Sequence, residues 1–215
     1  MHTRNLSSSS LHVFCPIPKF DILYVENGLF DDFTFDKYLG KYVVLFFYDI
    51  KNNPEVFPDE IITISKNRKL FEELNVVLLA VSNDNVFTLT SLILHNHLIH
   101  YEQNPVNLNV NIDFPLLADK NNEIALYFNV WNFKNPHLYQ KKVIIINPQG
   151  IIKKIFDSSI KKNIDKVIKS IREFKFTDAE DHHRREITRR NRKFDKASIF
   201  IFKLALNNYI INTDL

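Results

Sequence analysis

The one thiol in this sequence is Cys15, the only cysteine among 215 residues. A thiolate can attack an electrophile or bind a metal ion, but no charged neighbour lowers the pKa of this thiol. A lone cysteine of this kind usually behaves as a small, inert hydrophobic residue. An intramolecular disulfide is excluded, and a secreted, disulfide-stabilised protein is not expected.

A second candidate site is the group formed by His95, His97 and His100, with Tyr101 and Glu102 beside it. On a helix, His97 and Tyr101 share a face with His100 nearby, whereas His95 points elsewhere. A zinc site needs three or four convergent ligands, and a fourth is missing here. We therefore expect a solvated helix end, with no metal ion and no cofactor.

The segment 56–60 has the composition of a helix start. Pro58 suits the first helical position, and Asp59 and Glu60 suit the positive end of the helix dipole. Phe57 stands immediately before the proline, and its ring offers no nucleophilic atom. Because buried aromatic rings usually pack in a core, we expect Phe57 to hold the helix start against the preceding strand.

A basic segment lies near the C-terminus. Residues 184–196 hold seven Lys or Arg and two acids, a net charge of +5, so the rest of the chain carries −2 of the total of +3. Such a run could contact nucleic acid, an acidic protein or an anionic membrane, or it could be a solvated helix or arm. Between residues 182 and 193 no Phe, Tyr or Trp is interleaved for base stacking. The candidate contact residues are Arg184, Arg185, Arg189, Arg190, Arg192 and Lys193.

The elements that must position these residues alternate along the chain. Apolar runs predict buried strands, and apolar residues at helical spacing predict helices. Turn residues at 26–28 and 147–150 predict hairpins. We expect strands at 20–25, 42–48, 76–81, 143–146 and 151–156, and helices from 58 and over 85–98, 121–128 and 159–174. This order predicts a thioredoxin-like α/β sandwich, and no apolar run reaches the ~20 residues of a membrane-spanning helix.

Several motifs occur in the order found in the peroxiredoxins, and the chain resembles that alkyl hydroperoxide reductase/thiol-specific antioxidant family, of the typical two-cysteine type. The matching segments are Pro16-Ile-Pro-Lys-Phe20, Leu39-Gly-Lys-Tyr-Val-Val-Leu-Phe-Phe-Tyr48, Ala80-Val-Ser-Asn-Asp84, Phe114-Pro-Leu-Leu-Ala-Asp119 and Phe174-Lys-Phe-Thr-Asp178. The resemblance implies a peroxiredoxin-type sandwich, with a central mixed sheet flanked by helices. It also implies a thioredoxin-dependent peroxidase by descent.

The same resemblance indicates that the catalytic residues are missing. The family reduces peroxide with a thiolate placed just before Pro-Thr-Glu, and here Pro58 and Glu60 are kept while Phe57 takes the place of the cysteine. Pro54 then stands at the family's threonine position. Lys141 stands at its arginine position, keeping the charge without the planar guanidinium.

A second alignment with the family motif leads to the same interpretation. Aligning on Tyr48 instead of Pro58 puts Val56 at the position of the nucleophile. The position of the family's second cysteine, the resolving cysteine, falls near Arg184. Neither alignment supplies a nucleophile.

We therefore expect a catalytically silent peroxiredoxin-like protein that acts as a scaffold or accessory subunit through protein–protein binding, as a homodimer or higher oligomer, with the protein partner unidentified. The alternatives are a divergent thiol peroxidase that uses Cys15 and an adaptor that binds nucleic acid or membrane through the basic segment. The expected organisation is a flexible tail at 1–13, the peroxiredoxin-like domain at 14–178 and a basic, then apolar, arm at 179–215. A cytoplasmic location is expected, with mitochondrial or nuclear locations as alternatives.

Overall fold

A seven-stranded mixed sheet forms the centre of the fold, with the strand order β2-β1-β7-β4-β3-β8-β9. The computed structural model describes residues 17–48, 57–94, 99–101, 104–106, 111–131 and 139–211. The strands of this sheet are β1 (Leu23–Glu26), β2 (Leu29–Asp32), β3 (Tyr42–Phe47), β4 (Val76–Ser82), β7 (Leu116–Ala118), β8 (Val143–Ile146) and β9 (Ile152–Phe156).

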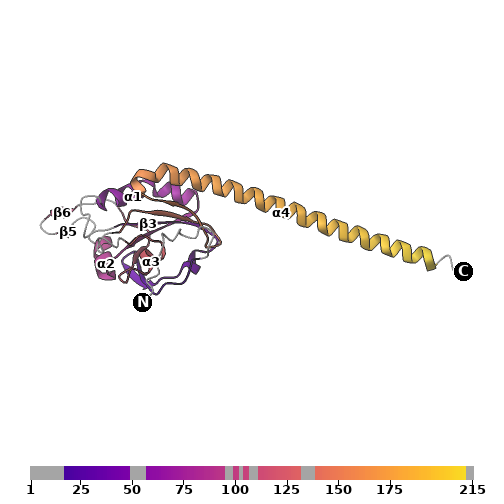
Figure 1. The fold of residues 1–215 in the computed structure, drawn as a ribbon, viewed down its shortest axis with the longest axis horizontal. Helices are drawn as coiled ribbons and strands as arrows, with labels where there is room; N and C mark the ends of the chain where they lie inside the picture. Colours follow the sequence, from indigo (N-terminus) through magenta and orange to yellow (C-terminus); the bar gives the residue numbers. More distant parts are fainter. Residues whose placement is uncertain are drawn as a thin grey trace, which may run out of the picture. The chain divides into compact units, whose positions relative to one another are not determined.

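Within the described residues, the remaining elements are four helices, one short 3-10 helix and a separate two-stranded pair. Their bounds are α1 (Phe57–Glu73), α2 (Val86–Leu94), α3 (Glu123–Tyr127), α4 (Ile160–Ile211), the 3-10 helix Phe35–Tyr38, β5 (Ile99–Tyr101) and β6 (Asn104–Val106). Figure 1 shows α1 on one side of the sheet and α2 and α3 on the other. The predicted thioredoxin-like α/β sandwich with a mixed sheet is therefore confirmed.

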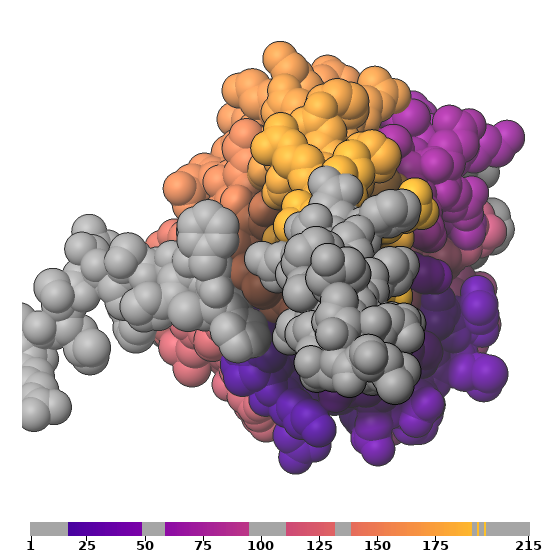
Figure 2. Space-filling view, turned by 90° about the vertical axis from the view of Figure 1, so that its right-hand side faces the viewer, coloured from indigo at the N-terminus to yellow at the C-terminus, as the bar shows by residue number. Residues whose placement is uncertain are grey.

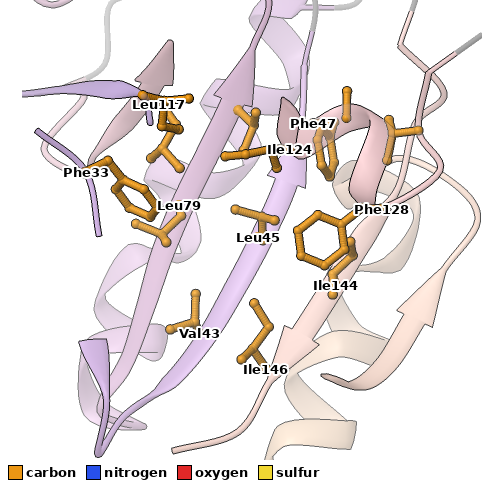
Figure 3. Close-up of a cluster of buried hydrophobic side chains, with 14 of the residues drawn as sticks. Phe33, Val43, Leu45, Phe47, Leu79, Leu117, Ile124, Phe128, Ile144 and Ile146 are labelled. Atoms are coloured by element: carbon orange, nitrogen blue, oxygen red, sulfur yellow. The ribbon is translucent and has the colours of Figure 1, made fainter. Parts of the chain in front are cut away.

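Strand β3 lies in the interior of the sheet, between β4 and β8, and its side chains are apolar on both faces. All six of its residues are buried, and it pairs in parallel with β4 and antiparallel with β8. One face carries Val43, Leu45 and Phe47, which pack with Ile124 and Phe128 from the α3 region (Figure 3). Two covered faces explain why the strand reads as a continuous apolar run.

Two hairpins with short turns form the opposite edges of the sheet. Asn27 and Gly28 both have positive φ, as a two-residue hairpin turn between β1 and β2 requires. Between β8 and β9 the Asn147 side chain accepts hydrogen bonds from the backbone N–H groups of Gln149 and Ile151. Both hairpins predicted from turn residues are confirmed.

Helix α4 corrects the predicted end of the last helix. The prediction ended it at residue 174, whereas the helix continues to Ile211. Neither glycine nor proline occurs after Gly150, so no residue in this stretch interrupts a helix. The chain forms two compact units, residues 1–168 and 169–215. Helix α4 begins in the first unit and continues through most of the second.

The helix predicted over 85–98 is also corrected. Helix α2 ends at Leu94, and Ile99 instead pairs with Val106 in the β5–β6 ladder. This pairing takes His100 and Tyr101 out of the helical geometry that the sequence suggested. Within the described residues, no helix combines the length and apolar character needed to cross a bilayer.

Candidate functional site

Three parts of the chain that are distant in sequence meet around one cavity. They are the first turn of α1, the residues that lead into β8, and the continuous stretch formed by the turn after β9 and the first turn of α4. An ion pair between Asp59 and Lys161 joins the two helix starts. Both views show the orange region that contains the start of α4 beside α1, in magenta (Figures 1 and 2).

A largely buried ion pair in this region joins Lys141 to Glu60. The Lys141 Nζ donates a hydrogen bond to the Glu60 Oε2 at 2.6 Å. The Glu60 side chain is 1% exposed and that of Lys141 is 22% exposed. Burial raises the pKa of the Glu60 carboxyl, and the hydrogen bond and positive charge of Lys141 oppose that rise. Among the described residues, none donates to Oε1 of Glu60, so Lys141 is its main compensation for lost hydration.

A cavity of about 710 Å³ opens next to this pair. Its lining is mostly charged or hydroxylated and comes from all three parts: Asp59, Gln140, Lys141, Lys142, Asp157, Ser158, Ser159, Lys161 and Lys162. Lys142 Nζ lies 3.2 Å from the Asp157 carboxylate. The cavity can therefore bind charged or hydrogen-bonding groups, but its described lining offers no thiol.

The structure places some of the predicted site residues and leaves others outside its described part. Phe57 is the first residue of α1, as the helix-start pattern of Pro58 and Glu60 predicts. The expected packing of the Phe57 side chain concerns atoms outside the described set. Cys15 and Pro54 also lie outside the described residues.

Most of the histidine group lies outside the described residues, so the prediction about it stays a prediction. His100 and Tyr101 lie in β5, while His95, His97 and Glu102 lie outside the described residues. Among the residues that the structure describes, no three His, Cys, Asp or Glu side chains converge on a possible metal position.

The basic segment lies on α4. Five of its six candidate contact residues have described side chains, and all five are exposed: Arg184, Arg185, Arg189, Arg190 and Lys193. Arg192 lies on the same helix. The segment therefore presents positive charge along a helix rather than along an extended arm.

A second buried polar centre was missed by the sequence reasoning. Asp119 is fully buried and accepts hydrogen bonds from the backbone N–H groups of Ile124 and Ala125 and from the Tyr139 hydroxyl. Burial raises the pKa of Asp119 to about 6, against the opposing effect of these hydrogen bonds. Asp119, four residues before the first residue of α3, caps this helix, whereas the Asn122 side chain makes no capping hydrogen bond. The sequence showed Asp119 only as the end of a matching motif.

Comparisons with known proteins identify the family of this chain. Residues 14–155 match the model of the AhpC/TSA family. The chain is 32% identical over 165 residues to peroxiredoxin TSA1 of Saccharomyces cerevisiae, covering 75% of this chain and 79% of that protein. It is 30% identical over 173 residues to a mitochondrial thioredoxin-dependent peroxide reductase of Drosophila melanogaster, covering 79% of this chain and 70% of that protein.

Solved structures show the same fold. The Enterococcus faecalis AhpC structure superposes with a TM-score of 0.65 at 21% identity, covering 78% of this chain and 94% of the other. The reduced 2-Cys peroxiredoxin of Plasmodium vivax gives a TM-score of 0.65 at 23% identity, covering 78% and 99%. With the family match spanning most of the central sheet and the start of α1, this chain belongs to the AhpC/TSA family, the peroxiredoxins.

Proposed function

We propose that this chain is a peroxiredoxin-family protein without peroxidase activity, and that it acts as a scaffold or accessory subunit through protein–protein binding. The observation that carries the proposal is the identity of the first residue of α1. Phe57 stands there, followed by Pro58 and with Glu60 three residues on. A phenyl ring cannot supply the thiolate that peroxide reduction requires.

The surroundings of that position support loss of the nucleophile rather than loss of the fold. Glu60 still pairs with Lys141 at 2.6 Å, so the polar frame around the helix start is present. The only cysteine of the chain stands at position 15, 42 positions before Phe57. The proposal therefore describes a retained binding domain that lacks one chemical group.

The test is a peroxide-consumption assay on the full-length protein with thioredoxin and its reductase. Turnover no greater than that of buffer is expected, beside a catalytically active peroxiredoxin as the positive control. Turnover at the rate of that control would refute the proposal.

A divergent thiol peroxidase that uses Cys15 is the second candidate, and the names of the relatives favour it. The Drosophila relative is named as a thioredoxin-dependent peroxide reductase. This candidate predicts that peroxide converts Cys15 to a sulfenic acid, with loss of activity in Cys15→Ser. Mass spectrometry after a sulfenic-acid trap tests the first prediction, and a peroxidase assay of Cys15→Ser tests the second. A silent protein has no activity for this substitution to remove.

Self-association is part of the main proposal. Large apolar side chains are exposed on the first unit, namely Leu29, Phe30, Phe87 and Leu94, and exposed apolar groups that gather on a surface mark contact sites. A solved relative from Plasmodium yoelii is described as forming an artifactual octamer when modified at its N-terminus. Light scattering on the full-length protein should give a mass of at least two chains, and a monomer at all concentrations would exclude the homo-oligomer.

An adaptor that binds nucleic acid or membrane through α4 is the third candidate. The exposed arginines on this helix favour it, because basic side chains in solvent attract polyanions. Binding of this kind falls steeply with salt. A full-length protein that binds neither duplex DNA nor anionic vesicles at low salt would exclude it.

A further inference from the structure

We propose that the cavity between the starts of α1 and α4 is a binding site for a small phosphate dianion, either free phosphate or the phosphate of a monoester. The first observation is its lining. Four lysines, Lys141, Lys142, Lys161 and Lys162, border the cavity with two acids, Asp59 and Asp157. Counting the buried Glu60 that pairs with Lys141, the lysines still outnumber the acids by one. A volume of about 710 Å³ lies within the usual range of small-molecule sites.

The second observation is that each ion pair between residues lining the cavity has a carboxylate that is more than half exposed to water. Lys142 is 9% exposed at its side chain, yet its partner Asp157 is 79% exposed. The pair of Lys161 with Asp59 has both side chains 53% exposed. Exposed ion pairs of this kind contribute little because water competes for both charges. A dianion that contacts several ammonium groups at once can replace these carboxylates.

The third observation is an unfavourable placement of charge at the start of α4. Lys161 and Lys162 lie in the first turn, which contains no acidic residue. Cations at this end of a helix are disfavoured by the helix dipole. The ammonium group of Lys162 makes no ion pair with any described residue. A bound anion between the lysines and the first turn would turn this local repulsion into attraction.

Hydroxyl groups at the same place favour phosphate over a carboxylate ligand. Ser158 and Ser159 line the cavity, and Ser158 Oγ accepts a hydrogen bond from the Asn163 side chain. The Ser158 hydroxyl keeps its own hydrogen for a ligand oxygen. Tetrahedral phosphate offers more acceptor oxygens to such donors than a carboxylate does, and lysine is a common phosphate partner.

The experiment is calorimetric titration of the full-length protein with inorganic phosphate in chloride buffer. Saturable binding is expected, with a Kd below about 10 mM. Lys162→Ala should weaken it about tenfold, the effect of removing one charge-assisted hydrogen bond, and Lys162→Glu should abolish it. Lys166→Ala is the matched control, because Lys166 is exposed one turn further along α4 and outside the cavity lining.

Three results would overturn the proposal. They are the absence of saturation, equal weakening by Lys162→Ala and Lys166→Ala, and equal affinity for malonate, a dicarboxylate of similar charge. Circular dichroism of each variant checks that the fold is kept. A parallel titration with glycerol 3-phosphate distinguishes a site for the free ion from one that accepts an ester. None of these results depends on peroxidase activity, so they can fail or succeed independently of the proposed function.

Discussion

The ammonium group of Lys141 lies 2.6 Å from the Glu60 carboxylate, across 81 positions of sequence. Glu60 belongs to the first turn of α1, and Lys141 comes two residues before β8. The contact therefore joins the start of α1 to the segment before β8, the antiparallel neighbour of β3. Because Glu60 is almost fully buried, the pair contributes to folding even in the absence of catalysis.

Replacing Lys141 should expose how much Glu60 depends on it. Lys141→Met leaves a buried carboxyl without its partner, and we expect the free energy of unfolding to fall by about 3 kcal/mol. Urea unfolding followed by circular dichroism measures the change. Lys41→Met, at an exposed lysine, is the control and should change little.

A double variant separates the lost ion pair from lost packing. Glu60→Gln removes the buried charge, so Lys141→Met combined with Glu60→Gln should be more stable than Lys141→Met alone. The two sites are in contact, so their effects should be non-additive. Additive effects would show that the pair is not energetically coupled.

The raised pKa of Asp119 predicts a pH dependence of stability. Its pKa is about 6 in the folded protein against an ordinary 3.8, so the folded state binds the proton more tightly than the unfolded chain does. The free energy of unfolding contributed by this group is therefore greatest below pH 3.8 and is lost as the pH rises to about 6. A shift of this size corresponds to roughly 2–3 kcal/mol.

Asp119→Asn tests this assignment because asparagine does not titrate. The free energy of unfolding of both proteins should be measured by denaturant titration across this pH window. As the pH rises, the wild-type protein should lose stability relative to the variant. Burial raises the pKa of Glu60 in the same direction, and that contribution is common to both proteins and cancels in the difference. A constant difference across the window would contradict the prediction for Asp119.

A thiol placed at the start of α1 should be unusually acidic. Phe57→Cys in a Cys15→Ser background puts a single thiol at a helix N-terminus, where the dipole favours the thiolate. We expect its pKa to fall below the ordinary value of about 8.5. The ultraviolet absorbance of the thiolate measures it. Thr177→Cys, exposed within α4, is the control, and equal pKa values would contradict the prediction.

Alanine substitutions at two glycines allow the cost of backbone strain to be compared with the cost of a steric clash. Gly28 and Gly40 both have positive φ, so alanine is strained at either position. A Cβ at Gly28 would lie 2.8 Å from the Leu94 side chain, whereas nothing lies within 4 Å at Gly40. Gly40→Ala should destabilise the protein by about 1 kcal/mol, and Gly28→Ala by more. Equal thermal shifts would show that Leu94 moves aside freely.

Local sequence chemistry was sufficient for most of the individual elements. Asn27-Gly28 and residues 147–150 specify their turns because few residues tolerate those backbone angles. The apolar run of β3 indicates burial on both faces, and Pro58 with the following acids marks the start of α1. Local patterns failed where distant pairing decided the outcome. Thus Ile99 pairs with Val106 instead of extending α2.

The site divides in the same way. The sequence by itself determined the family, the element order and the absence of any cysteine but Cys15, because these follow from residue identities and short-range spacing. Only the tertiary structure brought Lys142, Lys161 and Lys162 to one cavity and placed Asp119 as the cap of α3. Contacts between distant segments depend on how strands and helices pack. The periodicity of the sequence does not predict which lysines from distant segments will line the same cavity.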